Sequence, residues 1–284
     1  MSDDSIGSLQ NWVGRSQVVT DIISLPVIEN MSATLGRDPG ELKAGDPLPP
    51  SWHWLFFNRG PVPGNLRPDG HIASSNFVPP IPLPRRMWAG NKIDVTKVLT
   101  IGRPAECLTT IESIIEKEGS SGRLIFLEER SEVTDDYNGY LLDRKTIVYR
   151  AEANNNKFIK SNAAPVDSTW RQTLEPNSVL LFRYSALTFN SHRIHYDRDY
   201  TTEIEGYPAL LVHGPLIATL LMNLLRQEMP RANVRNMNIR ATAPIFVDGA
   251  FTVNGVPAKN GKSVELWATT GSGELAMTID AELI

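Results

Sequence analysis

The chain has 284 residues, of which 41% are hydrophobic and 21% are charged, as is typical of a folded globular protein. A net charge of -4 argues against a protein that neutralises nucleic-acid phosphates. Cys107 is the only cysteine, so an intrachain disulfide is excluded and a reducing compartment fits. The polar start lacks the pattern of a secretion signal, and no apolar run approaches the roughly 20 residues that span a bilayer. We therefore expect a cytoplasmic protein without nucleic-acid or membrane partners.

The first half of the chain predicts a broken helix, a long loop and four strands. Apolar residues from Val18 to Leu35 follow an imperfect helical spacing, which Pro26 interrupts. Residues 47–84 are rich in Pro and Gly, which predicts a long irregular segment of the kind that often shapes a ligand site. Clusters of β-branched residues separated by turns indicate a four-stranded antiparallel meander at 93–101, 107–118, 123–133 and 141–151.

The second half predicts a buried helix among strands. The polar tract 154–168 resembles a link, so we place the boundary between the halves near residue 160. Residues 179–184 suggest a short strand. The run from Pro215 to Leu225 is apolar nearly all round, which predicts a buried helix capped by Gly214. Further strands are expected at 234–245, 249–256, 263–270 and 274–284. This order is typical of an α+β protein in which a curved antiparallel sheet wraps a central helix.

Three of the five histidines lie between Tyr184 and Gly214. Two segments there, Phe189-Asn190-Ser191-His192-Arg193-Ile194-His195-Tyr196-Asp197 and Val212-His213-Gly214, resemble the hydration motif of the MaoC-like, (R)-specific enoyl-CoA hydratase family. That motif reads Gly-Asp-x-Asn-Pro-(Ile/Leu)-His-x-Asp, and later (Val/Ile)-x-His-Gly at the start of the central helix. In this chain its Gly, Asp, Asn and Pro are replaced by Phe189, Asn190, His192 and Arg193.

These departures resemble the branch of hydroxyacyl-thioester dehydratase type 2 and mesaconyl-C4-CoA (itaconyl-CoA) hydratase. Residues 48–54 and 77–90 are similar to the N-terminal half of that branch, so the resemblance covers nearly the whole chain. It implies a double hot-dog fold, with two curved antiparallel sheets that each wrap a central helix. Residues 1–160 would form a largely non-catalytic half that shapes the acyl and CoA site, and residues 161–284 would carry the motif. Hot-dog sheets often pair, which suggests a homodimer.

Hydrating a double bond conjugated to a thioester requires a base for water, a donor for the thioester oxygen and a proton for the neighbouring carbon. His195 is the expected acid and base, since an imidazole has an ordinary pKa of about 6.5. Asn190 would hold the water, and the N–H of Gly214 at the helix N-terminus would stabilise the thioester oxygen. The resemblance implies an acyl-CoA thioester as substrate. No cofactor is expected, because coenzyme A is part of that substrate.

Further candidates would bind the substrate, and each has a plainer structural interpretation beside it. Arg193 is the preferred contact for a substrate carboxylate, because an arginine fork pairs well with carboxylates. It could equally be an ordinary ion-pair partner. Asn190 could serve only a turn, and the motif histidines could serve only local packing. No metal site is expected, because the histidines lack further ligands at a recognised metal spacing. The other substrate-binding candidates are Tyr184, His192, His213, Arg85 and Arg86, with Arg183 as a further arginine.

The function that the resemblance implies is reversible hydration of a short branched dicarboxylic acyl-CoA, such as itaconyl-CoA or mesaconyl-C4-CoA. A 3-hydroxyacyl-thioester dehydratase of fatty acid synthesis is an alternative, which a long apolar tunnel would favour. A non-catalytic acyl-thioester binding module is another, because Asn190 replaces the usual Asp and a fold alone does not determine a function. A thioesterase, which would direct water at the carbonyl carbon, is the third.

Overall fold

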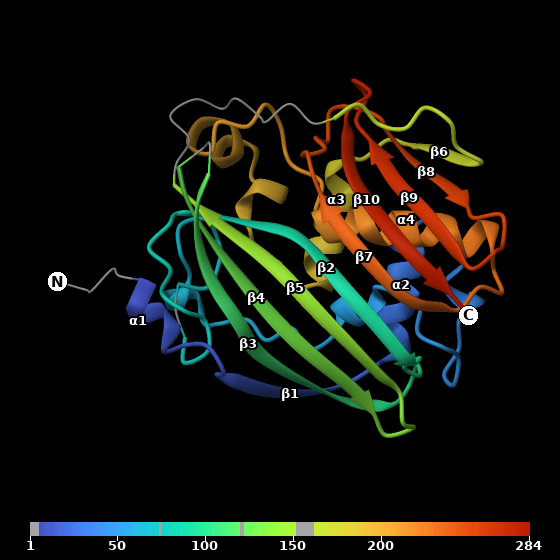
Figure 1. Cartoon of the computed structure of the whole chain (residues 1–284), viewed down its shortest axis with the longest axis horizontal. Coiled ribbons are helices and arrows are strands. Elements are labelled where there is room, and N and C mark those ends of the chain that lie inside the picture. Colours follow the sequence, from blue (N-terminus) through green and yellow to red (C-terminus); the bar gives the residue numbers. More distant parts are fainter. Residues whose placement is uncertain (1–5, 74, 120–121, 152–161) are drawn as a thin grey trace.

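The computed structural model describes residues 6–73, 75–119, 122–151 and 162–284. In this part of the chain, ten strands form one antiparallel sheet with the order β1-β3-β4-β5-β2-β7-β10-β9-β8-β6. Figure 1 shows the curved sheet with helices α2, α3 and α4 gathered on one side of it. This is the predicted α+β class. No helix among the described residues is long and apolar enough to cross a membrane.

The first half contributes one side of the sheet. Its strands are β1 (Ser16–Ile22), β2 (Arg85–Lys97), β3 (Pro104–Gly119), β4 (Gly122–Asp135) and β5 (Tyr140–Arg150). Strands β3, β4 and β5 follow one another as antiparallel neighbours, as predicted. The predicted meander is wrong for its first member, because β2 pairs with β5 and not with β3. The edge of β3 is taken instead by β1.

The two halves join where β2 pairs with β7 (Val234–Ala241). Gly90 pairs with Arg240 at this joint and has a φ of 149°. A Cβ atom on Gly90 would lie 1.9 Å from the carbonyl oxygen of Ile239, so only glycine permits this approach. The two curved sheets that the resemblance implied are therefore continuous at this seam. The predicted boundary near residue 160 falls in 152–161, outside the described residues.

The second half wraps its sheet around helix α4 (Gly214–Glu228). Every residue of α4 from Leu216 to Leu225 is buried, as predicted. His213 caps the helix, so α4 begins one residue earlier than expected. The strands β7 to β10 match the prediction closely, and β6 (Trp170–Leu174) was not predicted. The remaining bounds are β8 (Phe251–Pro257), β9 (Ser263–Thr269) and β10 (Leu275–Leu283).

Two short segments differ from the prediction. The expected broken helix is strand β1 followed by helix α2 (Leu25–Thr34), and Pro26 occupies the first turn, where its missing N–H costs nothing. Residues 179–184 belong to helix α3 (Ser178–Leu187) and not to a strand. Asn177 caps α3 by accepting a hydrogen bond from the N–H of Leu180 at 2.9 Å. Short apolar runs of this kind do not distinguish a helix from a strand.

The predicted irregular segment 47–84 is confirmed. Its described residues form short 3-10 helices at Trp52–Leu55 and Pro63–Asn65 and isolated β-bridges, and another 3-10 helix lies just before it at Pro39–Glu41. Trp52 and Phe56 are buried in the same hydrophobic cluster as α4. Helix α1 (Ile6–Gln10) lies against β3 and belongs to a second cluster through Leu9. The segment therefore covers the first half of the sheet where no long helix does.

Candidate active site

The motif begins where helix α3 ends. The N–H of Asn190 donates to the carbonyl of Ser185 at 2.8 Å, and the N–H of Phe189 donates to the carbonyl of Ala186 at 3.4 Å. This pair of bonds is a Schellman ending, whose penultimate residue takes the left-handed conformation that glycine favours. Phe189 has a φ of 50°. The MaoC-like hydration motif has glycine at this position, and glycine adopts the left-handed conformation without strain. Phe189 adopts the same conformation under strain, because its Cβ atom approaches the following carbonyl.

Asn190 has a local structural contact. Its Oδ1 accepts a hydrogen bond from the backbone N–H of His192 at 3.0 Å. The bond supports the turn into the 3-10 helix Arg193–His195. Asn190 thus stands at the position of the family's acidic residue and also fixes the backbone that carries the motif histidines.

His195 has the geometry of a base. Its side chain is buried, and its Nδ1 lies 2.8 Å from the carbonyl oxygen of Leu211. A carbonyl can only accept, so Nδ1 carries the proton and Nε2 keeps its lone pair. Burial lowers the pKa of His195 to about 4, although the bond to Leu211 opposes this. The imidazole is therefore neutral at pH 7 and able to accept a proton at Nε2.

His213 and Gly214 bring the start of α4 to His195. The rings of His195 and His213 stack, with centroids 3.6 Å apart. Nε2 of His213 lies 2.8 Å from the hydroxyl of Ser185, and burial lowers the pKa of His213. Gly214 is the first residue of α4, and the first N–H groups of a helix have no partner within it. The helix dipole therefore favours negative charge beside Gly214.

Trp88 of β2 covers Gly214. A Cβ atom on Gly214 would lie 2.4 Å from the indole ring, so the absence of a side chain is required here. The indole N–H of Trp88 donates to Oδ1 of Asn91, whose amide donates to Asp143. The same carboxylate accepts from His53 at 3.0 Å and from the indole of Trp54 at 2.8 Å. This buried network holds Trp88 against the start of α4.

Tyr184 supports the site from behind. Its side chain is 2% exposed, and its ring centroid lies 5.0 Å from that of His213. Burial raises the pKa of Tyr184, despite a hydrogen bond with Thr219. Tyr184 was a candidate for substrate binding, and the structure places it within the core beneath His213.

Four histidines form a continuous row. Ring centroids are 4.0 Å apart for His71 and His192, 5.5 Å for His192 and His195, and 3.6 Å for His195 and His213. Burial lowers the pKa of His71 and of His192. The sequence singled out the three motif members but missed His71, whose only signal was its place in the irregular segment. The first half of the chain therefore contributes a side chain to the row.

The loop that carries His71 is bound to the motif through its backbone. The carbonyl of Gly70 accepts from the hydroxyl of Ser191 at 2.6 Å, and the carbonyl of Asp69 accepts from the N–H of Arg193 at 2.9 Å. Gly70 has a φ of 89°, and a Cβ there would lie 1.9 Å from the carbonyl oxygen of Ser191. The backbone of this loop thus lies directly against the backbone of the motif at Ser191.

The arginine candidates differ in what they bind. Nε and Nη2 of Arg193 both donate to Oδ2 of Asp197, at 2.9 and 2.7 Å, and its Nη1 donates to the carbonyl of Pro68. The fork preferred for a substrate carboxylate is therefore already occupied by the Asp197 carboxylate. Arg85 donates to the carbonyl of Glu205 at 3.0 Å and lies 3.8 Å from its carboxylate. Arg183 is exposed on α3.

Arg86 is in a different situation. It is half-buried, and its Nη1 lies 3.4 Å from Nε2 of His71. Among the described residues, no carboxylate forms an ion pair with it. Asp69 lies on the other side of His71, with its Oδ2 3.3 Å from Nδ1.

Asp69, His71 and His192 each offer one ligand atom, and these atoms lie within 4.8 Å of one another. The motif histidines alone gave no reason to expect a metal, and this trio depends on a loop far away in the sequence. Arg86 lies 3.4 Å from His71, and Arg67 lies 3.7 Å from Asp69. These two cations disfavour a divalent ion at the trio, because like charges at such distances repel.

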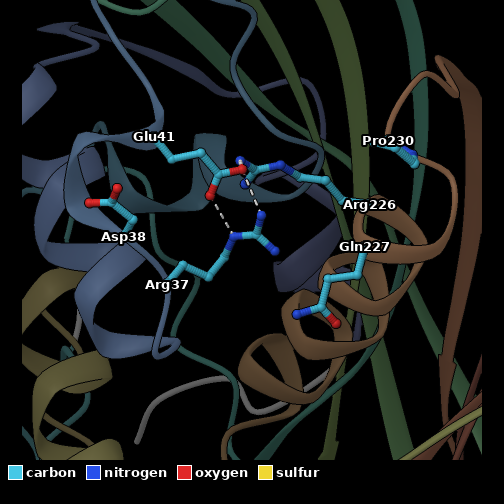
Figure 2. Close-up of a pocket in the computed structure, with 6 residues that line it drawn as sticks. All are labelled: Arg37, Asp38, Glu41, Arg226, Gln227 and Pro230. Atoms are coloured by element: carbon cyan, nitrogen blue, oxygen red, sulfur yellow. Dashed lines mark hydrogen bonds and ion pairs between the residues drawn. The ribbon is translucent and has the colours of Figure 1, made fainter.

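Two hollows lie towards the C-terminal end of α4, away from the row of histidines. One is a mainly apolar cavity of about 200 Å³, lined by side chains that include His53, Ile93 and Met222. The other, of about 590 Å³, is shown in Figure 2. There Arg37 and Arg226 both point towards Glu41 and bind it at 2.6 and 2.7 Å. The two guanidinium groups in this second hollow thus share one carboxylate.

Comparison with solved structures identifies the fold. A MaoC-like dehydratase from Phytophthora capsici superposes with a TM-score of 0.70 at 12% identity, covering 95% of each chain. HtdX of Mycobacterium tuberculosis superposes with a TM-score of 0.66 at 15% identity, covering 95% of this chain and 100% of that one. At such low identity the likeness shows the fold alone, and it confirms the double hot-dog fold of MaoC-like dehydratases.

Comparison of sequences identifies the family. Residues 51–247 match the family model of hydroxyacyl-thioester dehydratase type 2. The chain is 40% identical over 273 residues to mesaconyl-C(4)-CoA hydratase of Chloroflexus aurantiacus, covering 96% of each protein. It is 28% identical over 263 residues to the mitochondrial hydroxyacyl-thioester dehydratase type 2 of Schizosaccharomyces pombe, covering 81% of this chain and 87% of that one. The chain belongs to the hydroxyacyl-thioester dehydratase type 2 family, and it is a hydro-lyase that acts on acyl thioesters.

Proposed function

We propose that this protein reversibly hydrates a short branched dicarboxylic acyl-CoA of the mesaconyl-C4-CoA kind, with itaconyl-CoA as a related substrate. The observation that carries the proposal is the 40% identity, over 96% of both proteins, to an enzyme named for mesaconyl-C4-CoA. The position of the neutral His195 beside the start of α4 supports a hydration mechanism.

In this mechanism for mesaconyl-C4-CoA, whose double bond is conjugated to the thioester, Nε2 of His195 takes a proton from water as the hydroxide adds to the carbon β to the thioester. The electron pair of the double bond moves towards the thioester oxygen and forms an enolate. The N–H of Gly214 stabilises this oxygen, aided by the dipole of α4. The protonated His195 then returns the proton to the α carbon, so one water is added in total. The reverse sequence removes it. In itaconyl-CoA the double bond lies one carbon farther away and must first shift to the conjugated position.

Asn190 supports this chemistry without exchanging a proton, because an amide is not a base at neutral pH. Its Oδ1 holds the N–H of His192, and its amide nitrogen is the group proposed to orient the water. Hydration changes no net oxidation state, so the proposed reaction requires no redox cofactor, and coenzyme A enters as part of the substrate.

The full-length protein should be assayed with mesaconyl-C4-CoA, itaconyl-CoA and crotonyl-CoA, following enoyl absorbance and product mass. We expect a dicarboxylic substrate to gain one water. Release of free coenzyme A would instead identify a thioesterase, and binding without turnover would identify a binding module. Turnover confined to crotonyl-CoA or longer chains would contradict the proposed substrate class.

A second candidate is a 3-hydroxyacyl-thioester dehydratase of fatty acid synthesis. The mitochondrial relative from Schizosaccharomyces pombe favours it, and so does the apolar cavity along α4. However, none of the motif residues lines that cavity. Assays with longer 3-hydroxyacyl thioesters, carried either on coenzyme A or on acyl carrier protein, distinguish the two candidates.

We also propose that the protein acts in the cytoplasm as a homodimer. The lone Cys107 suits a reducing compartment. Strand β1 lies at an edge of the sheet and exposes Val18 and Ile22, each to 54%. Exposed apolar edges of this kind favour pairing with another chain. Sedimentation equilibrium measures the mass in solution, and a monomer at micromolar concentration would contradict the dimer.

A further inference from the structure

The side chains of Arg86 and Trp88 both reach the region of the motif and the start of α4. The two residues are separated by one position on β2, and the register of this strand shifts only after Trp88, so their side chains lie on one face of the sheet. Trp88 packs against Gly214 at the start of α4. Arg86 reaches His71, which is next to His192 in the row of histidines. Its guanidinium therefore lies beside the proposed active site.

Among the described residues Arg86 has no direct carboxylate partner, although its charge, together with that of Lys145, lowers the pKa of the buried Glu129. Arginine stays protonated in proteins, and removing such a charge from water without an anionic partner is costly. Within the described part of the chain no carboxylate lies within ion-pair distance of Arg86, whereas Arg193 and Arg85 have Asp197 and Glu205. The charge of Arg86 acts on the site directly, since it helps to lower the pKa of His71 and of His192.

His71 orients this guanidinium. An arginine can only donate hydrogen bonds, so Nε2 of His71 accepts from Arg86 and the proton of the ring resides on Nδ1. Nδ1 in turn faces Oδ2 of Asp69 at 3.3 Å. Asp69, His71 and Arg86 thus lie in contact one after another, with His71 between the carboxylate and the guanidinium. Arg86 retains further N–H donors that His71 does not use.

We propose that Arg86 binds the free carboxylate of the acyl chain and so selects dicarboxylic over monocarboxylic thioesters, with Asp69 and His71 as positioning residues. This inference rests on the proposed substrate class. A planar guanidinium can hold a carboxylate through two parallel N–H bonds, which gives both affinity and orientation. Of the arginine candidates, Arg193 of the motif is occupied by Asp197, and Arg86 takes its proposed role.

The test compares kcat/KM for mesaconyl-C4-CoA and crotonyl-CoA in the wild type and in Arg86→Gln. Both substrates carry the same coenzyme A, and only the first has a free carboxylate. Arg86→Gln should lower kcat/KM for the dicarboxylic substrate by about 10²-fold, the usual cost of losing one partner of a buried charged hydrogen-bond pair. We expect a change of less than about 3-fold for crotonyl-CoA, for which the inhibition constant replaces kcat/KM if turnover is slow.

Arg85→Gln is the matched control, because Arg85 is the preceding residue of β2 and binds Glu205. Its ratio of the two kcat/KM values should equal that of the wild type. His71→Gln, which retains an acceptor for Arg86, should raise KM for mesaconyl-C4-CoA much more than it lowers kcat, and should leave KM for crotonyl-CoA unchanged.

The two possible failures are distinct. If the wild type hydrates no dicarboxylic thioester, the proposed function fails and the role of Arg86 fails with it. If the wild type hydrates mesaconyl-C4-CoA but Arg86→Gln weakens both substrates equally, Arg86 serves the shared coenzyme A or the fold, and only this inference is overturned. Retained activity of Arg86→Gln on crotonyl-CoA also demonstrates that the variant is folded.

Discussion

The two halves of the sheet differ in the elements and side chains that pack against them. The second half wraps α4, whose residues from Leu216 to Leu225 are all buried, and among the described residues no carboxylate is buried in this half. Among the described residues, the first half has the short helices α1 and α2 and the irregular segment 47–84 beside it, and its sheet carries the buried carboxylates of Glu129 and Asp143. A long apolar helix fixes the motif in place, whereas a loop over a partly polar face can deliver charged side chains. The half without the motif is therefore the proposed source of Asp69, His71 and Arg86.

The largest expected effect tests the half that carries the motif. His195→Ala should lower kcat by about 10²–10⁴-fold, the usual contribution of a general acid and base. Asn190→Ala should lower kcat by only about 10-fold, because Asn190 orients groups and exchanges no proton. Single-turnover kinetics with the preferred substrate measure both. Equal losses in the two variants would mean that Asn190 has a larger part in the reaction than its amide chemistry allows.

Gly70→Ala tests the contact between the halves. Its Cβ would meet the carbonyl oxygen of Ser191 at 1.9 Å, in a backbone conformation with a φ of 89°. We expect the free energy of unfolding to fall by about 3 kcal/mol, together with a lower kcat, because the loop that holds His71 must move. Gly64→Ala is the control in the same segment, since a Cβ there meets nothing within 4 Å. Similar denaturation curves for the two variants would contradict the close contact.

The row of histidines makes stability depend on pH. The pKa of His195 is about 4 in the folded protein and near 6.5 when exposed, so between these values the unfolded chain binds a proton that the folded protein does not. Above about pH 6.5, His195 is neutral in both states, so its titration should not change the free energy of unfolding. This free energy should fall as the pH is lowered, by about 2 kcal/mol at pH 5 from His195 alone. Urea denaturation at pH 7 and pH 5 measures this, and His195→Asn should show a smaller fall than the wild type.

Phe189→Asn carries the smallest expected effect. Asparagine tolerates the left-handed conformation that Phe189 adopts, and the phenyl ring is 67% exposed, so little burial is lost. We expect the free energy of unfolding to rise by about 0.5 kcal/mol. Phe182→Asn is the control, since Phe182 is 64% exposed within the regular part of α3 and should be slightly destabilised by the same change. A loss of stability in both variants would refute strain at Phe189.

The features that the sequence predicted well are long and periodic. Helix α4 and the strands β7 to β10 have enough residues for their apolar pattern to be unambiguous. Helix α3 was mistaken for a strand because residues 179–184 are too few to show a period. The position of β2 between β5 and β7 was not predicted, because pairing between strands so far apart in the sequence leaves no local pattern.

The site shows the same division between local and distant information. His192, His195, His213 and Gly214 were found because the motif keeps them close in the sequence. His71 and Asp69 were missed because they reach the motif only through the folded chain. The occupation of Arg193 did have a signal, since Asp197 follows it at the i+4 spacing typical of an ion pair.

The seam between β2 and β7 has a consequence for synthesis of the protein. Gly90 leaves the ribosome long before its partner Arg240, so one edge of β2 stays unpaired until the second half has been synthesised. An unpaired strand edge is a template for wrong pairing with other chains, and contacts between distant parts of a sequence form slowly. The nascent first half is thus the stage at which this chain is most exposed to aggregation, and chaperones that shield strand edges should matter most there.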